Sequence, residues 1–130
     1  MTATTLTRIL YIEDEPDIQA VARLALENIG GYTLEVCSTG AESLEKGPSF
    51  NPDLILMDVM MPGMDGPTTL AELRKNPGLT ETPVIFMTAK VQPDEISELK
   101  SLGAIDVIAK PFDPMTLSQV ISDIWQKQAA

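Results

Sequence analysis

Short apolar runs alternate with amphipathic segments along the chain. Four runs are uninterrupted and have a charged residue or a proline on at least one side, at 9–12, 54–57, 84–87 and 107–109. Such runs are typical of strands that are covered on both faces, as in a parallel sheet. The segment 34–36 instead alternates apolar and polar side chains, which predicts a strand at an edge of the sheet.

Amphipathic helices are predicted between the strands. Apolar residues recur with the period of a helix that lies on a sheet: Ile18, Val21, Ala22, Ala25, Leu26 and Ile29. Gly30 and Gly31 are expected to end this helix. A second stripe over 117–125 predicts a closing helix with Asp113 as its N-cap and Pro114 at its first helical position. Because proline is tolerated in a first helical turn, further helices are predicted to begin near Pro16, Pro67 and Pro93.

Five strand-then-helix units follow from this pattern. Their short connections favour right-handed crossovers, so the fold class is α/β, a doubly wound parallel sheet with helices on both faces. We expect one domain over residues 6–128, with loose termini at 1–5 and 129–130. In such sheets ligands bind outside the carboxyl ends of the strands, and that is where functional residues are expected.

Composition excludes several kinds of chemistry. The chain has 130 residues, no His, one Cys and a formal charge of −10. Zinc sites of the Cys/His type, Ser-His triads and internal disulfides are therefore excluded. The acidity argues against nucleic acid as a partner. No stretch approaches the ~20 apolar residues of a membrane helix and no secretion leader is evident, so we expect no membrane association and a cytoplasmic location.

Polar side chains directly follow four of the predicted strands: Glu13, Asp14, Asp58, Thr88 and Lys110. Each alone could be a helix cap, a strand end or a surface charge. Together they place three carboxylates at one rim, and two carboxylates ~4 Å apart repel by about 4 kcal/mol at an effective dielectric of about 20. Either a retained proton or a divalent cation is needed, and a set of oxygen ligands alone suits Mg²⁺.

With a cation present, the remaining residues suit phosphoryl transfer, which requires positioning and charge neutralisation. Asp58 can act as the nucleophile and form an acyl phosphate. Lys110 supplies a positive charge for the phosphoryl oxygens, and the Thr88 hydroxyl can donate a hydrogen bond to one of them.

Four motifs in this order resemble the receiver domains of two-component response regulators. They are YIEDE at 11–15, MDVMMPGMDG at 57–66, MTAK at 87–90 and KPF at 110–112. The resemblance covers residues 6–128 and implies a flavodoxin-like sheet with strand order 2-1-3-4-5. It also implies a cis peptide between Lys110 and Pro111.

The resemblance implies a role for each residue of the rim. Asp58 would be the phosphoacceptor, Thr88 the switch hydroxyl and Lys110 the lysine typical of the family. The Mg²⁺ ligands would be Glu13, Asp14, Asp58 and the backbone carbonyl of Met60. The protein would then be a signalling phosphoacceptor rather than an enzyme, although it would assist its own phosphorylation and dephosphorylation.

The same resemblance suggests the partners. A sensor histidine kinase or a phosphotransfer protein would supply the phosphoryl group, and phosphorylation would change affinity for a downstream target. The chain would be a stand-alone receiver, either a monomer or a dimer that forms on phosphorylation.

Two residues depart from the usual receiver pattern. Val107 stands where receivers usually carry Tyr or Phe, so the signal must travel by another route, for which the loop 88–91 and the helix near Pro93 are candidates. Glu13 replaces the commoner Asp and is one methylene longer, so we expect metal binding to survive. Met60 and Lys90 flank the phosphoryl position, and because Met60 cannot orient a water, slow self-dephosphorylation is expected.

Three rival functions remain as alternatives. An aspartyl-phosphate phosphatase of the haloacid dehalogenase type would need an Asp-x-Asp pair after the first strand, where Glu13, Asp14 and Glu15 stand. A flavin binder would need amides facing a phosphate there, and acidic residues repel one. A receiver-like scaffold that is never phosphorylated is opposed by the intact set of Asp58, Thr88 and Lys110.

Overall fold

The computed structural model describes residues 5–129. Five parallel strands alternate with helices along the chain. The strands are β1 (Arg8–Ile12), β2 (Thr33–Cys37), β3 (Leu54–Asp58), β4 (Val84–Thr88) and β5 (Asp106–Ala109). The α-helices are α1 (Pro16–Arg23), α2 (Gly40–Phe50), α3 (Gly66–Leu73), α4 (Pro93–Ser101) and α5 (Leu117–Ala129). A π-helix, η1 (Leu24–Ile29), continues α1, and a short 3-10 helix, η2 (Pro77–Leu79), precedes β4.

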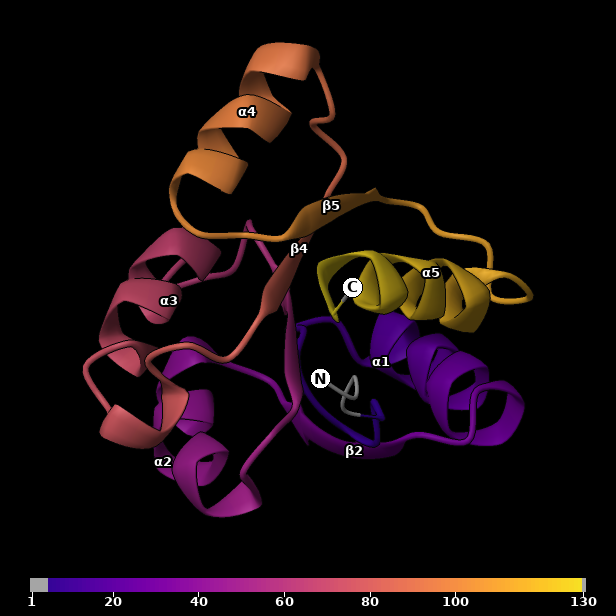
Figure 1. Ribbon diagram of the computed structural model, residues 1–130, viewed down its shortest axis with the longest axis horizontal. Coiled ribbons are helices and arrows are strands. Elements are labelled where there is room, and N and C mark those ends of the chain that lie inside the picture. The colour runs from indigo at the N-terminus through magenta and orange to yellow at the C-terminus, as the bar shows by residue number, and fades with distance from the viewer. Residues whose placement is uncertain (1–4, 130) are drawn as a thin grey trace.

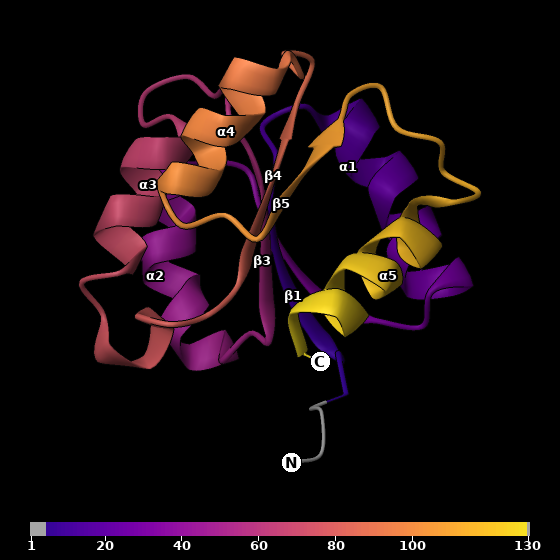
Figure 2. The same cartoon turned by 45° about the horizontal axis from the view of Figure 1, so that its top comes forward.

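The sheet has the strand order β2-β1-β3-β4-β5, and every pairing is parallel. Helices α1 and α5 cover one face, and α2, α3 and α4 cover the other (Figures 1 and 2). The predicted doubly wound sheet is therefore confirmed, as is the position of the strand at 34–36, since β2 lies at one edge.

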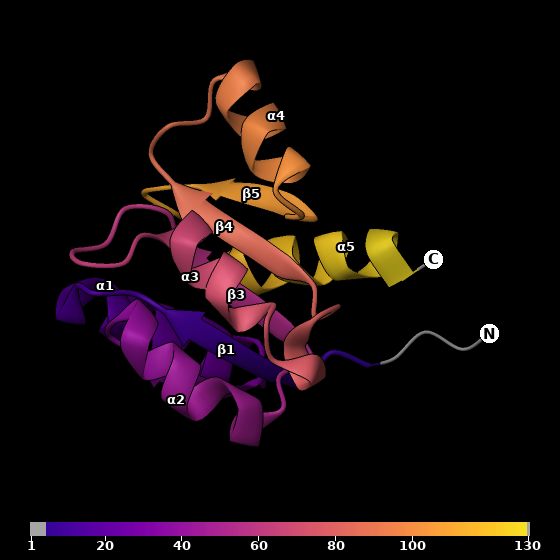
Figure 3. The same cartoon turned by 90° about the vertical axis from the view of Figure 1, so that its left-hand side faces the viewer.

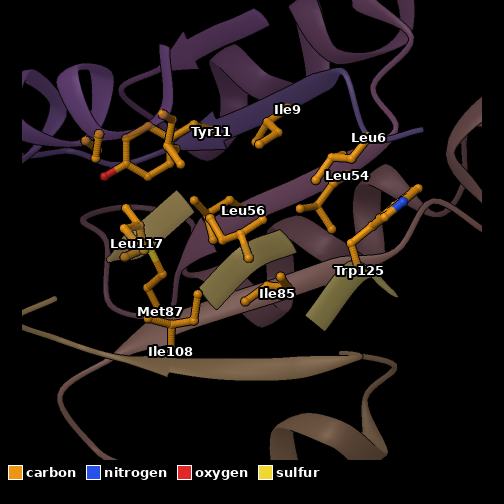
Figure 4. Packing of buried hydrophobic residues seen from close by; sticks show 14 residues of the cluster. Leu6, Ile9, Tyr11, Leu54, Leu56, Ile85, Met87, Ile108, Leu117 and Trp125 are labelled. Atoms are coloured by element: carbon orange, nitrogen blue, oxygen red, sulfur yellow. The ribbon is translucent and has the colours of Figure 1, made fainter. Parts of the chain in front are cut away.

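The core is split by the sheet into two layers because successive strand residues point to opposite faces. In β1, Ile9 and Tyr11 pack toward α1 and α5 (Figure 4), whereas Leu10 and Ile12 pack toward α2 and α3. All residues of β3 and β4 are buried, as their continuous apolar runs predict. β5 is an edge strand with Ala109 exposed, so its apolar run was wrongly read as covered on both faces.

The first helix departs from its predicted apolar stripe. In η1 the Gly30 N–H donates to the Ala25 carbonyl five residues back, the bond of a π turn. A π turn holds more residues than an α turn, so the side chains that follow it no longer point toward the sheet. Ile29 is 50% exposed as a result, and Val21, at the margin of the stripe, is also exposed. The prediction that both lie in the core was wrong.

The closing helix begins later than predicted. The Asp113 carboxylate accepts a hydrogen bond from the Met115 N–H, at 2.9 Å, so Asp113 caps the segment as expected. The Thr116 N–H, however, bonds three residues back to the Asp113 carbonyl, and this tighter turn precedes the regular helix, which begins at Leu117. Pro114 therefore lies in a turn and not at the first position of α5.

The carboxyl ends of the strands all lie at one end of the sheet, and the start of β1 and the end of α5 lie at the other (Figures 2 and 3). The loops that follow β1, β3, β4 and β5 therefore meet at a common rim. Within the part of the chain that the structure describes, no helix has the length and apolar character required to cross a membrane.

Candidate functional site

Strand pairing places the predicted site residues together. Asp58 and Thr88 are the last residues of β3 and β4, and Glu13 and Lys110 directly follow β1 and β5. The ladders extend into these positions, because the Glu13 N–H donates to the Cys37 carbonyl at 3.0 Å and the Lys110 N–H to the Thr88 carbonyl at 2.9 Å. Backbone hydrogen bonds thus fix where the side chains leave the sheet.

Three carboxylates converge at this rim. One oxygen each from Glu13, Asp14 and Asp58 lies within 4.8 Å of the others. Glu13 is fully buried, Asp58 is nearly so and Asp14 is half-buried. Oxygen-only ligands that meet in this way fit a hard cation such as Mg²⁺, and they fit zinc poorly because no His or Cys side chain belongs to the group.

Lys110 bridges two of the carboxylates. Its Nζ lies 2.9 Å from Asp58 Oδ2 and 3.0 Å from Glu13 Oε1, with little of any of the three side chains exposed. Burial alone would lower the pKa of Lys110, but the hydrogen bonds to Asp58 and Glu13 raise it above its ordinary value. The ammonium therefore stays charged and neutralises part of the acidic cluster.

Glu13 is held in an unfavourable environment for a charge. Burial raises the pKa of Glu13 to about 7, with the Lys110 hydrogen bond opposing the shift and the Asp58 charge adding to it. Its second oxygen accepts the Glu15 N–H at 3.2 Å. A cation near this carboxylate would favour its ionised form.

A cavity of about 240 Å³ opens beside Asp58. It is lined by Asp14, Glu15, Asp58, Met60, Thr88, Ala89 and Lys110. Met60 is 65% exposed at its margin. Glu13 is not among the residues that line the cavity. The cavity is large enough for a cation together with water, and it leaves the Asp58 carboxylate accessible.

Thr88 faces the same cavity from β4 and is nearly buried. Its Oγ1 accepts a hydrogen bond from the Lys90 N–H at 3.0 Å. The hydroxyl hydrogen is not used in that bond. Thr88 can therefore donate to an oxygen placed in the cavity while it stays tied to the loop after β4.

Two further residues support the site, namely Gln19, which sequence reasoning missed, and Gly66, the last residue of the motif at 57–66. Gln19 of α1 donates to the Glu13 carbonyl and, at 3.1 Å, to the Ser38 hydroxyl, which ties the end of β1 to the loop after β2. Gly66 begins α3, and its N–H donates to the Val59 carbonyl at 2.8 Å. For Gln19 the sequence offered only the weak signal of a polar residue beside an apolar stripe.

Two features of β5 and the loop after it were singled out in the sequence, namely Val107 and the peptide before Pro111. Val107 in β5 is half-buried and packs on the face covered by α3 and α4. The peptide between Lys110 and Pro111 is cis, as the resemblance implied.

The sequence profile of the response regulator receiver domain matches residues 9–122. The chain is 33% identical over 126 residues to the regulatory protein AtoC of Escherichia coli, covering 97% of this chain and 27% of AtoC. It is 37% identical over 114 residues to the transcriptional regulatory protein ResD of Bacillus subtilis, covering 88% of this chain and 46% of ResD. The chain thus spans less than half the length of these two relatives.

Solved structures agree with the sequence comparison. The chemotaxis protein CheY4 of Vibrio cholerae superposes with a TM-score of 0.84 at 28% identity, covering 92% of this chain and 99% of that one. The receiver domain of the Francisella response regulator 1452 gives 0.81 at 28% identity, covering 94% and 98%.

Fold and site together define a flavodoxin-like signalling domain with an acidic site at the carboxyl ends of its strands. The chain belongs to the receiver domain family of two-component response regulators.

Proposed function

We propose that this chain is a phosphorylation-activated switch in which Asp58 accepts a phosphoryl group in the presence of Mg²⁺. The donor is a sensor histidine kinase or a phosphotransfer protein. Phosphorylation changes the affinity for a downstream target protein, and no nucleic acid or membrane takes part. The observation that carries this proposal is the position of Asp58, which lines an open cavity while it bonds Lys110 at 2.9 Å.

Asp58 is the nucleophile of the proposed reaction. One of its carboxylate oxygens attacks phosphorus, the new O–P bond forms, and the P–N bond to the donor imidazole breaks. The electron pair of the broken bond passes to the imidazole nitrogen, which takes up a proton. Lys110 and Thr88 stabilise the phosphoryl oxygens by charge and by a hydrogen bond.

Mg²⁺ would be held by the Glu13, Asp14 and Asp58 carboxylates and by the Met60 backbone carbonyl. When bound, it supplies positive charge that offsets the phosphoryl oxygens. Glu13 does not line the cavity, so it would hold the cation through a water, and its extra methylene would be accommodated in that way. Asp14, at the cavity wall, is placed for direct contact.

The switch acts through the loops that leave the rim. A phosphoryl group adds about −1.5 to −2 charges and strong acceptor oxygens beside Thr88 and Lys110. Thr88 is tied to the Lys90 N–H, so a shift of its hydroxyl is carried into the loop before α4. Because Val107 replaces an aromatic residue, this loop is the proposed route of the signal.

The proposed unit of function is the domain at 6–128. It acts in the cytoplasm as a monomer or as a dimer formed on phosphorylation. Light scattering with and without a phosphodonor distinguishes these two oligomeric states.

Incubation with Mg²⁺ and acetyl phosphate, followed by intact-mass measurement, tests the proposal. We expect one phosphoryl adduct that depends on Mg²⁺ and is lost in Asp58→Asn. Asp94→Asn, on the exposed start of α4, is the matched control and should keep the adduct. No adduct with acetyl phosphate or with purified kinases would instead favour a scaffold that is never phosphorylated.

A further inference from the structure

An exposed methionine stands at the mouth of the acidic cavity. Met60 lines this cavity together with the Asp58 carboxylate, and 65% of the residue is exposed. Asp58, by contrast, is nearly buried. Asp58 therefore forms the base of the cavity, and the thioether of Met60 is open to solutes that approach it from solvent.

Exposure distinguishes Met60 from most other methionines among the residues that the structure describes. Met115 is also open to solvent, at 72% exposed, but it does not line the cavity. The others are buried or half-buried, at Met57, Met61, Met64 and Met87. Because a peroxide must reach the sulfur to oxidise it, Met60 and Met115 are the described methionines expected to react first.

Oxidation would change the chemistry of the cavity mouth. A thioether is a weak hydrogen-bond acceptor, whereas a sulfoxide carries a polar oxygen that accepts readily. The other exposed residues that line the cavity are Glu15 and Ala89. Ala89 has no polar side chain, and the negative charge of Glu15 is repelled by a phosphoryl group. A Met60 sulfoxide would therefore supply a neutral acceptor at the mouth, where a carboxylate is disfavoured.

Hydrolysis of an aspartyl phosphate needs a water at this same place. The water attacks phosphorus in line with the bond that breaks, so it comes from the side opposite the Asp58 oxygen. Because Asp58 forms the base of the cavity, that side is the mouth. An acceptor that takes a hydrogen bond from the water holds it in position and makes its oxygen more nucleophilic.

We propose that Met60 is a site of oxidative modification, at which hydrogen peroxide forms a sulfoxide that shortens the lifetime of the aspartyl phosphate. The inference rests on the proposed function and deepens it. A sulfur lone pair forms the new S–O bond and the O–O bond of the peroxide breaks. The leaving oxygen takes up the proton of the transferred oxygen and departs as water, so the sulfur is oxidised and the peroxide is reduced.

The sulfoxide then acts on hydrolysis without being consumed. The water oxygen bonds to phosphorus, the bond from phosphorus to Asp58 breaks, and its electron pair stays on the Asp58 carboxylate. The protons of the water leave with the phosphate or pass to solvent. A sulfoxide orients the water but is too weak a base to take its proton. We therefore expect about three- to tenfold faster hydrolysis, below the roughly 100-fold or more of a general base.

Partly oxidised protein tests the inference in a single sample. The chain is treated with hydrogen peroxide until a fraction carries one added oxygen, then phosphorylated with Mg²⁺ and acetyl phosphate and freed of the donor. Intact mass follows the loss of the adduct from oxidised and unoxidised molecules in the same solution, and peptide mapping locates the added oxygen. We expect molecules oxidised at Met60 to lose the phosphoryl group about three- to tenfold faster.

Two variants assign the effect to one sulfur. Met115→Leu leaves Met60 as the exposed methionine of the described residues and should keep the difference between oxidised and unoxidised molecules. In Met60→Leu the added oxygen falls on Met115, outside the cavity, and both kinds of molecule should lose the phosphoryl group at one rate. Methionine sulfoxide reductases specific for each epimer should restore the slower loss in Met115→Leu.

The outcomes separate the inference from the proposed function. Equal rates for oxidised and unoxidised Met115→Leu, or peptide maps without oxygen at Met60, overturn the role of Met60 alone. Oxidised protein that takes up no phosphoryl group also overturns it, because the proposed effect is on loss. Absence of an adduct on the unaltered, unoxidised protein overturns the proposed function and this inference with it.

Discussion

Gly66 lies directly against the backbone of Asp58, and a Cβ at Gly66 would sit 2.6 Å from the Asp58 carbonyl oxygen. The Phe86 ring and Val59 Cα, each 3.0 Å away, close the other sides. Gly66→Ala must therefore displace the end of β3 that carries the proposed phosphoacceptor. We expect a loss of about 1–3 kcal/mol in free energy of unfolding and slower adduct formation with acetyl phosphate. Urea denaturation and intact mass measure the two effects.

Gly78→Ala is the control for this substitution. The nearest atom to a Cβ there is Asn76 Oδ1 at 3.4 Å, and the position is exposed and far from the rim. It should change neither stability nor phosphorylation appreciably. Wild-type phosphorylation by Gly66→Ala would mean that the end of β3 tolerates the extra methyl group.

Removal of the Lys110 charge should destabilise the metal-free protein. Lys110→Met keeps the apolar stem but leaves Asp58 and Glu13 close together without a cation, and breaking a buried ion pair costs about 3–5 kcal/mol. We expect a loss near the lower end, because Lys110 is partly exposed. Millimolar Mg²⁺ should recover part of it in urea denaturation.

Lys75→Met is the matched control, because Lys75 pairs with Glu72 on an exposed helix surface. Exposed pairs contribute about 1 kcal/mol or less. If the two lysine variants were equally stable without Mg²⁺, the bridge between Asp58 and Glu13 would carry no stabilising charge interaction.

Stability without Mg²⁺ should depend on the protonation of Glu13. Its pKa is about 7 in the folded protein against 4.5 for the free side chain, so the folded state binds the proton more tightly. The stabilising contribution of protonated Glu13 to the free energy of unfolding is therefore present below pH 4.5 and is lost as the pH rises toward 7. The unfolding free energy of the wild type minus that of Glu13→Gln should fall over this range in urea denaturation.

Added Mg²⁺ should reverse the trend, because a bound cation favours the carboxylate form. A difference between wild type and Glu13→Gln that stays flat, or that rises with pH in metal-free buffer, would contradict the raised pKa of Glu13.

The phosphorylated protein should lose its phosphoryl group slowly. Met60 lines the cavity beside Asp58 and has no group that orients an attacking water. Met60→Asn adds such a group, so we expect several-fold faster loss of the adduct by timed intact-mass measurement. Met115→Asn, at an exposed position outside the cavity, should not change the rate. Decay of the wild-type adduct within seconds would overturn the prediction.

The sequence predicted most of the sheet because its buried strands carry unbroken apolar runs. β3 and β4 each have a neighbouring strand on both sides, so both are fully buried. Their apolar runs alone were therefore enough to predict buried strands. The π turn at η1 had no such signal, since the same residues fit an α-helical stripe that continues to Ile29. Only the hydrogen bond from Gly30 to Ala25 reveals why Ile29 leaves the core.

The sequence predicted which residues meet at the rim, but it did not predict which hydrogen bonds these residues make with one another. Reading the residue after each apolar run identified Asp58, Thr88 and Lys110, because parallel strands end at one rim. Which carboxylates Lys110 bridges depends on side-chain packing that no spacing encodes.

The start of β1 and the end of α5 both lie opposite the rim, and this has a practical consequence. A surface tether or reporter that leaves the molecule beyond these two points would project away from the acidic cavity and leave approach to it from bulk solvent unobstructed. Immobilised receptor formats, in which donors and targets flow past a fixed layer of protein, are thus suited to this molecule.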